Sequence, residues 1–162
     1  MKKLDGNQSP GPMIRSMWAR LSAIPGGKLL FSKAIGKAAP YTGTIGLEVL
    51  DVEPGYARLQ MKDRKKVRNH LNSIHAVALM NLAEATTGLA MSAGLPDGAR
   101  GILKGLQMEY LKKARGLLTS ECRIEVIEST ERRELEIQGE ICNRSGEVVA
   151  RAVATWVVGP VK

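Results

Sequence analysis

Three side chains that can take part in acyl-transfer or proton-transfer chemistry follow one another at short spacing in the middle of this chain: the amide Asn69, the imidazole His75 and the carboxylate Glu84. Between positions 74 and 93 His75 and Glu84 are the only ionisable residues in an otherwise apolar segment. Burying a carboxylate costs several kcal/mol of desolvation free energy unless it is paired or protonated, so a buried one usually has a partner or a chemical role. Glu84 is therefore either a catalytic acid or base, or a structural carboxylate paired with an arginine or a helix start across a dimer.

The spacing of His75 and Glu84 limits how they can cooperate. If 74–92 is a helix, Glu84 lies about half a turn around it from His75 and ~13 Å further along its axis. The two side chains then cannot share one site within one chain. Two antiparallel helices crossing near Met80 in a homodimer would bring Glu84 of one copy to the helix start of the other. Free backbone N–H groups there can polarise a carbonyl or hold an oxyanion.

The same residues resemble the Asn, His-Gly-Gly, Leu-x-Asp/Glu signature of hotdog-fold acyl-CoA thioesterases. The similar branch is that of the phenylacetate-degradation (PaaI-type) and 4-hydroxybenzoyl-CoA thioesterases, including its members of unknown function. The matching positions are Asn69, Asn72, His75, Ala76, Leu82 and Glu84. The resemblance extends from about residue 40 to the C-terminus and implies an α+β hotdog fold, in which an antiparallel sheet wraps around one long helix.

The resemblance also implies an activity and roles for residues. The protein is expected to hydrolyse a fatty or aryl acyl-CoA thioester without metal or cofactor, as an obligate homodimer or a dimer of dimers. Glu84 would be the nucleophile or general base, and the Ala76 N–H would bind the thioester oxygen. Asn69 and His75 would shape the pocket around the attacked group. Residues expected to contact the substrate or the phosphates of coenzyme A are Asn72, Arg68, Lys112, Lys113 and Arg115.

The chain departs from the signature at the helix start. Ala76-Val77 replaces Gly-Gly, and a Cβ at Ala76 keeps the N–H but narrows the approach to it. Asn72 stands where the family has glycine, and asparagine tolerates left-handed backbone angles better than most residues. A non-catalytic acyl-CoA or acyl-lipid binding protein of the same fold therefore stays open. A hotdog hydratase or dehydratase is less favoured, because His75 precedes the helix core.

Composition narrows the class of protein. The chain has 162 residues, 44% of them hydrophobic, and a net charge of +8, which suits one globular domain. It has no apolar run long enough to span a bilayer, and the basic clusters lack nucleic-acid-binding motifs. Cys122 and Cys142 lie on separate predicted strands, outside any CxxC or Cys/His cluster. Reduced thiols, a cytoplasmic location and no zinc site are the expectation.

Periodicity and turn residues predict the elements. Residues 1–13 should be a loose arm, followed by helices at 13–23 and 28–39, which makes 1–40 an N-terminal extension and 41–162 the hotdog domain. A membrane-surface role for the first helix is the less favoured alternative. Strands are expected at 44–53 and 56–62, then the helix at 74–92 with Ser73 as its N-cap. Four more strands should follow, at 102–111, 117–127, 134–143 and 148–158.

Overall fold

The computed structural model describes residues 9–161 and contains one sheet and four α-helices. The helices are α1 (Pro10–Ser22), α2 (Gly27–Ala38), α3 (Pro40–Thr44) and α4 (Ala76–Gly94), with a single 3-10 turn η1 at Lys65–Val67. The strands are β1 (Glu48–Glu53), β2 (Tyr56–Met61), β3 (Ala99–Tyr110), β4 (Leu118–Arg123), β5 (Arg133–Cys142) and β6 (Val148–Pro160). The sheet is antiparallel throughout, in the order β1-β2-β4-β5-β6-β3.

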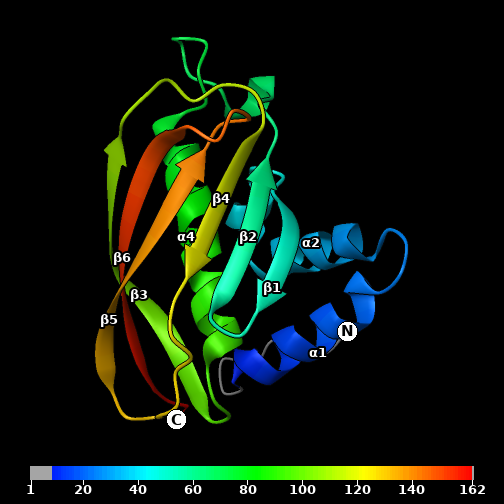
Figure 1. Ribbon diagram of the computed structural model, residues 1–162, viewed down its shortest axis with the longest axis vertical. Coiled ribbons are helices and arrows are strands. Elements are labelled where there is room, and N and C mark those ends of the chain that lie inside the picture. Colours follow the sequence, from blue (N-terminus) through cyan, green and yellow to red (C-terminus); the bar gives the residue numbers. More distant parts are fainter. Residues whose placement is uncertain (1–8, 162) are drawn as a thin grey trace.

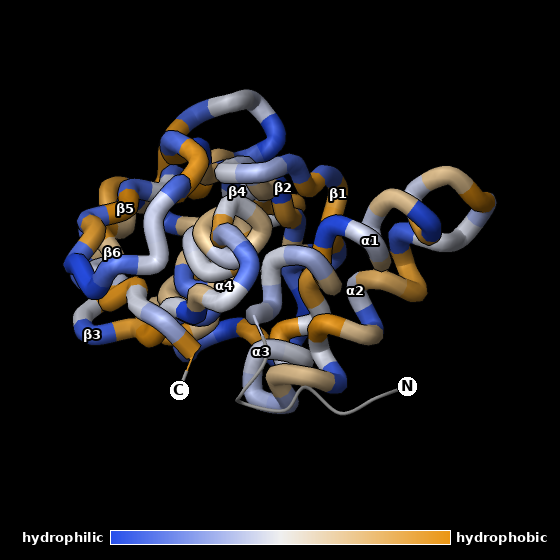
Figure 2. Tube along the Cα trace, turned by 90° about the horizontal axis from the view of Figure 1, so that it is seen from below, coloured by the Kyte–Doolittle hydropathy of each residue, from blue (hydrophilic) through white to orange (hydrophobic). Residues whose placement is uncertain are grey.

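The long helix α4 lies inside the curve of this sheet and contacts all six strands (Figure 1). Its sequence is rich in alanine, leucine and methionine and contains no proline, which favours an uninterrupted helix. Leu82, Ala83 and Ala90 are fully buried. In the view from below, the sheet curls around one side of the helix while α1, α2 and α3 lie to the other (Figure 2). The predicted α+β fold, an antiparallel sheet around one long helix, is confirmed.

The N-terminal helices form a hairpin that packs against β1 and one end of α4. The Trp18 and Phe31 rings join α1 to α2, edge to face at 5.0 Å. Arg15 Nη1 donates to the carbonyl oxygens of Ala93 and Leu95, at 2.8 and 3.0 Å. The predicted loose arm over 1–13 is wrong for its last residues, because Pro10 begins α1 and proline is well accepted in a first helical turn. The rest of that predicted arm, 1–8, lies outside the described residues.

Several boundaries differ from the predictions. Residues 44–47 precede β1 because α3 occupies Pro40–Thr44, and the strand predicted to reach residue 127 ends at Arg123. The helix predicted from residue 74 begins at Ala76, and its N-cap is His75 instead of Ser73. Ser73 lies two residues before this N-cap, and its Oγ donates to the Ala114 carbonyl oxygen at 2.9 Å.

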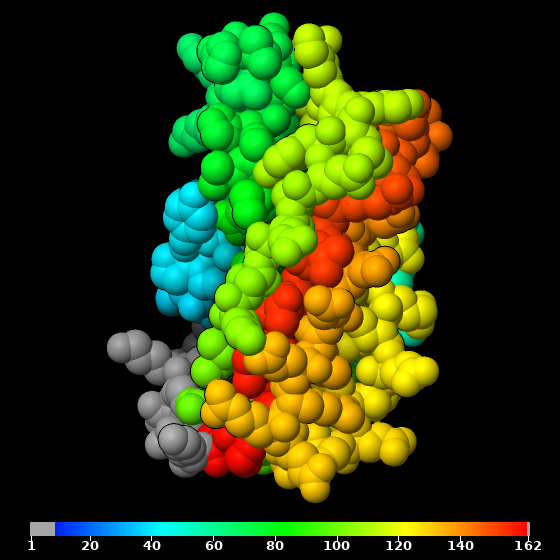
Figure 3. Space-filling view, turned by 90° about the vertical axis from the view of Figure 1, so that its left-hand side faces the viewer, coloured from blue at the N-terminus to red at the C-terminus, as the bar shows by residue number. Residues whose placement is uncertain are grey.

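The two edges of the sheet are covered differently. Helix α2 packs on the β1 edge. At the other edge β3 is paired on one side only, with β6, and crosses the face shown in Figure 3 with no helix over it. Cys122 and Cys142 are unpaired thiols. No helix between residues 9 and 161 combines the length and apolar character needed to cross a membrane.

Candidate active site

The start of α4 has one open backbone donor. Val77 N–H donates to His75 Nδ1 at 3.1 Å, and the N–H groups of Ala78 and Leu79 donate to the His75 carbonyl oxygen at 2.9 and 3.2 Å. Within the described residues, this leaves the Ala76 N–H as the one amide of the first four without an acceptor. The open donor is the Ala76 N–H, the group to which the family resemblance assigns binding of the thioester oxygen.

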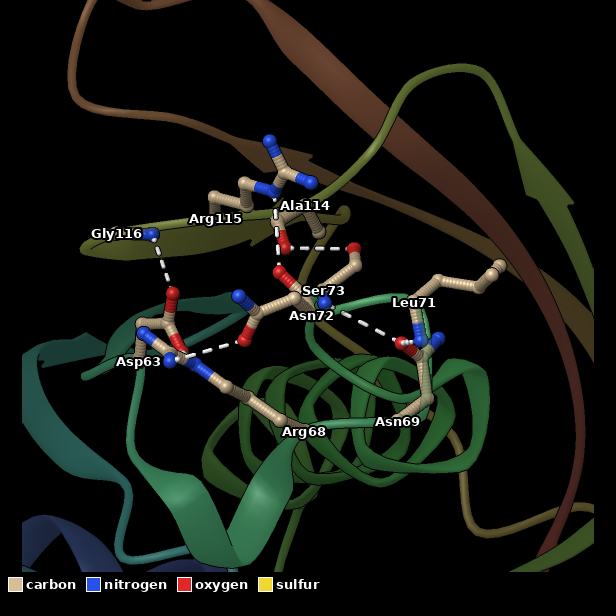
Figure 4. A network of polar contacts seen from close by, with 9 residues as sticks. All are labelled: Asp63, Arg68, Asn69, Leu71, Asn72, Ser73, Ala114, Arg115 and Gly116. Atoms are coloured by element: carbon tan, nitrogen blue, oxygen red, sulfur yellow. Dashed lines mark hydrogen bonds and ion pairs between the residues drawn. The ribbon is translucent and has the colours of Figure 1, made fainter.

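The loop before α4 is held by the side chain of Asn69. Its Oδ1 accepts from the N–H groups of Leu71 and Ser73, at 3.0 and 3.2 Å (Figure 4). The Ser73 hydroxyl and the Ile74 N–H both bond to the Ala114 carbonyl oxygen, at 2.9 and 2.8 Å. The Asn69 side chain thus holds the loop by binding backbone N–H groups within it, and the loop is anchored to the β3–β4 connection.

Asn72 occupies the turn of this loop in a left-handed conformation, with φ of 56°. It is the only described non-glycine residue with positive φ, as expected where the family has glycine. Arg68 Nη1 donates to Asn72 Oδ1 at 3.2 Å, and Arg115 Nε donates to the Asn72 carbonyl oxygen at 3.1 Å. Both arginines therefore contact the turn directly.

Asp63 completes the network in Figure 4. One of its oxygens accepts from Arg68 Nε at 2.6 Å and the other from the Gly116 N–H at 3.0 Å. The hydrogen bond from Arg68 is the main cause that lowers the pKa of Asp63 below its ordinary value. Arg68, Asn72 and Arg115, predicted as ligand-binding residues, are brought together beside the helix start, where each also stabilises the loop.

The two predicted lysines lie on the same β3–β4 connection. Lys112 forms an ion pair with Glu147, and this contact lowers the pKa of the Glu147 carboxyl. Lys113 is exposed. Of the cations expected to meet coenzyme A, Arg68 and Arg115 thus bond to Asn72, Lys112 pairs with Glu147, and Lys113 is exposed.

Glu84 lies apart from this group, in the third turn of α4. It is partly buried, and burial raises the pKa of its carboxyl above the ordinary value of 4.5. Its side chain has no hydrogen bond or ion pair with any residue between 9 and 161. The structural alternative, a carboxylate paired with an arginine or a helix start across a dimer, involves a second chain and stays open beside the catalytic role. The described part of the chain also has no group of His, Cys, Asp and Glu that could hold a metal ion.

Glu84 belongs to the face of α4 that the sheet leaves partly accessible. At helical spacing, this face carries Val77, Met80, Glu84 and Gly88. It is bordered by β3, where the Tyr110 hydroxyl donates to the Ala76 carbonyl oxygen at 3.2 Å. On the other side lies α3, whose Tyr41 carbonyl oxygen accepts from Asn81 Nδ2 at 3.2 Å. We call this surface the open face of α4.

Trp156 is a residue beside Glu84 that sequence reasoning did not select. A Cβ built on Gly88 would lie 3.0 Å from the indole ring and 4.0 Å from Glu84 Oε1. The indole is 6% exposed, and its Nε1 has no acceptor among the described residues. Alternation along β6 points Trp156 inward, but only the packed structure shows that it contacts the helix at the glycine next to Glu84.

Comparison with known families places the chain. A family model described as a domain of unknown function, DUF4442, matches residues 27–158, from the start of α2 into β6. The chain belongs to the DUF4442 family. The family match begins at α2, so it includes part of the region predicted as an N-terminal extension. Among curated proteins, no sequence matches the chain.

Solved structures similar to this DUF4442 protein include hotdog-fold proteins of the thioesterase family. A structural-genomics protein, APC5556, is 31% identical with a TM-score of 0.77, over 91% of this chain and 98% of its own. A Pseudomonas aeruginosa protein of unknown function, named a probable thioesterase, is 24% identical with a TM-score of 0.73, over 85% and 97%. A phenylacetic acid degradation-related protein from Ralstonia eutropha is 24% identical with a TM-score of 0.63, over 78% and 97%. The last two likenesses establish the fold alone.

Proposed function

We propose that this protein is an acyl-CoA thioesterase, which hydrolyses a fatty or aryl acyl-CoA to the free acid and coenzyme A. The observation that carries the proposal is the state of Glu84: an unpaired, partly buried carboxylate on the open face of an otherwise apolar helix. A protein keeps such a group at a cost in stability, which a catalytic role explains. The thioesterase names among the fold's relatives agree with this choice.

The reacting groups come together across a homodimer in this proposal. Glu84 is the ninth residue of α4, so it lies ~12 Å along the axis from the open Ala76 N–H of its own chain. An antiparallel partner helix packed on the open face would bring its Ala76 N–H opposite Glu84. The long uncovered edge of β3 supports the same assembly, because a long open edge strand favours pairing with another chain.

The mechanism follows from these two groups. Glu84 attacks the thioester carbonyl, or removes a proton from the water that does. The partner's Ala76 N–H donates to the oxygen as it becomes negative, and the helix N-terminus adds its positive dipole end. Burial raises the pKa of Glu84, which makes its carboxylate a stronger base than an exposed glutamate. Collapse of the intermediate expels coenzyme A as a thiolate. If Glu84 acts as the base, the proton that it took from water passes to this thiolate and the free acid is released. If Glu84 attacks directly, a water molecule then hydrolyses the acyl–Glu84 anhydride, which releases the acid and restores the carboxylate.

Binding of coenzyme A is assigned to Arg68, Lys113 and Arg115. Arg68 and Arg115 bond to Asn72 in the loop that precedes α4, and Lys113 is exposed two residues before Arg115. A pyrophosphate or 3′-phosphate carries the opposite charge. The unpaired Cys122 and Cys142 agree with a reducing, cytoplasmic compartment.

A non-catalytic acyl-CoA binding protein is the second candidate, and the Cβ of Ala76 is the observation that favours it. This methyl group stands beside the open N–H, where the family signature has glycine, and narrows the path of the thioester oxygen. The candidates are separated by thiol release from short-chain, medium-chain, long-chain and aryl acyl-CoAs. Turnover of any of them supports the thioesterase, whereas saturable binding without turnover supports the binding protein.

A further inference from the structure

The helical hairpin α1–α2 carries an exposed apolar surface at its outer end. Ile24 in the connecting loop is 49% exposed, and Leu29 and Leu30 in the first turn of α2 are 50% and 52% exposed. In Figures 1 and 2 this end of the hairpin projects away from the sheet and from α4. Three half-exposed aliphatic side chains within seven positions form a patch that neither the hairpin nor the domain covers.

The charges of the hairpin are all positive. Residues 10–47 contain five Lys or Arg and no Asp or Glu. Two of these cations serve the fold: Arg15 bonds to carbonyl oxygens at the end of α4, and Lys28 Nζ donates to the Leu50 carbonyl oxygen at 2.6 Å and lies over the Trp18 ring.

The other three cations of the hairpin make no polar contact that stabilises the described fold. Arg20, Lys33 and Lys37 have no hydrogen-bond or ion-pair partner within residues 9–161. At 100° per residue, Leu29, Leu30, Lys33 and Lys37 fall within one arc of about 100° on α2. Exposed leucines and unpaired lysines therefore share a single face of the helix. We define the hairpin patch as Ile24, Leu29, Leu30, Arg20, Lys33 and Lys37.

Acidic groups near the patch have partners of their own. In β1, beneath α2, Glu48 accepts from Gln60 and Lys62, and Glu53 lies 3.8 Å from Arg123. Asp51 Oδ1 accepts from the Val52 N–H at 3.0 Å. Glu48 and Glu53 are thus paired with cations outside the patch, and Asp51 bonds within its own strand.

We propose that the hairpin patch docks the protein on an anionic lipid bilayer, with Ile24, Leu29 and Leu30 in the interfacial region and the three cations over lipid phosphates. Aliphatic groups flanked by unpaired Lys and Arg are the combination that interfacial helices use. A second copy of the same patch fits poorly, because it would place three cations against three without an acid. The sheet order sets β1 and β3 at opposite edges, so docking through α2 leaves the β3 edge free. The proposal stands independently of the thioesterase activity.

The test is flotation of the full-length protein with vesicles of phosphatidylcholine, with and without phosphatidylglycerol. The protein should float with the anionic vesicles and remain behind with the neutral ones. Each cation held at an anionic surface strengthens binding about fivefold, so the triple variant Arg20→Gln, Lys33→Gln, Lys37→Gln should lose about 100-fold. The double variant Leu29→Ser, Leu30→Ser should reduce binding at least tenfold, or about 1.4 kcal/mol, while thermal unfolding reports an intact fold.

Matched controls separate the patch from net charge and general hydrophobicity. Lys65→Gln, Lys66→Gln, Arg144→Gln removes the same charge elsewhere, and Val126→Ser removes another exposed aliphatic side chain. Both should bind as the wild type does. Absence of flotation, equal binding to neutral vesicles, or equal loss in the controls would overturn the proposal. Concentration-dependent self-association that Leu29→Ser, Leu30→Ser abolishes would replace the membrane with a second copy.

Discussion

Glu84 and Trp156 flank Gly88, on the helix and the strand respectively, and neither the carboxylate nor the indole Nε1 has a hydrogen-bond partner in the described chain. Gly88 leaves room for both: the position of a Cβ there is 3.0 Å from the indole and 4.0 Å from Glu84 Oε1. The proposed catalytic carboxylate and the buried indole thus both lie within contact range of a side chain at position 88.

Gly88→Ala is expected to destabilise the protein. Alanine improves helix propensity by about 1 kcal/mol, but overpacking against a buried ring costs about 1–3 kcal/mol. We expect a net loss of about 1 kcal/mol in the free energy of unfolding, measured with urea. Trp156→Phe, which removes the ring atoms in contact, should make Gly88→Ala neutral or stabilising. Stabilisation by Gly88→Ala in the wild-type background would contradict the close packing.

The raised pKa of Glu84 makes a prediction about stability and pH. Because the folded pKa lies above 4.5, the folded state holds this proton more tightly than the unfolded state. Ionisation of Glu84 lowers the free energy of unfolding. This loss is absent below the pKa of Glu84 in the unfolded state, grows as pH rises through its pKa in the folded state, and is complete above that value. Glu84→Gln should therefore be more stable than the wild type near neutral pH, with the difference vanishing in acid. Urea unfolding of both proteins at several pH values measures this, and a difference that grows toward acid would contradict it.

Asn72 should tolerate glycine better than alanine. An alanine with the φ of 56° found at this position is strained by about 1 kcal/mol, whereas glycine adopts the conformation without strain. Asn72→Gly loses only an exposed hydrogen bond with Arg68. In thermal unfolding, Asn72→Gly should remain near the wild type while Asn72→Ala melts several degrees lower. Equal melting temperatures for the two variants would show that the turn does not need the left-handed conformation.

Ala76→Pro tests the proposed oxyanion donor. Proline at the first helical position keeps its natural φ, and His75, with φ −66° and ψ 140°, already has the extended conformation that precedes proline. The variant should fold while losing the open N–H, and kcat/KM should fall about 100- to 1000-fold. Ala76→Gly is the control, since it keeps the N–H and removes the obstructing methyl group. Full activity in a folded Ala76→Pro variant would exclude this donor.

The regular elements could be predicted because their residues repeat with the period of a helix or strand. The apolar run at 74–92 and the alternation at 148–158 both correspond to elements of the structure, α4 and β6. Helix α3 could not be predicted: it has only five residues, and its Thr-rich end reads equally well as the start of a strand.

The local chemistry of the site depended on contacts that spacing does not reveal. Ser73 is a good N-cap residue by type, but its hydroxyl bonds to Ala114, 41 positions away, and His75 caps the helix instead. Arg68 and Arg115 could be recognised as cations near the site. The bond from Arg68 to Asn72 joins residues four positions apart, whereas the bond from Arg115 forms only once the β3–β4 connection folds back onto the loop.

The most direct test of the account is thiol release from a panel of acyl-CoAs by the wild type and by Glu84→Gln, side by side. We expect turnover of a fatty or aryl acyl-CoA by the wild type and none above background by the variant, with acyl-CoA affinity unchanged within a few-fold. Turnover that survives in Glu84→Gln would contradict the assignment of Glu84 as the catalytic carboxylate.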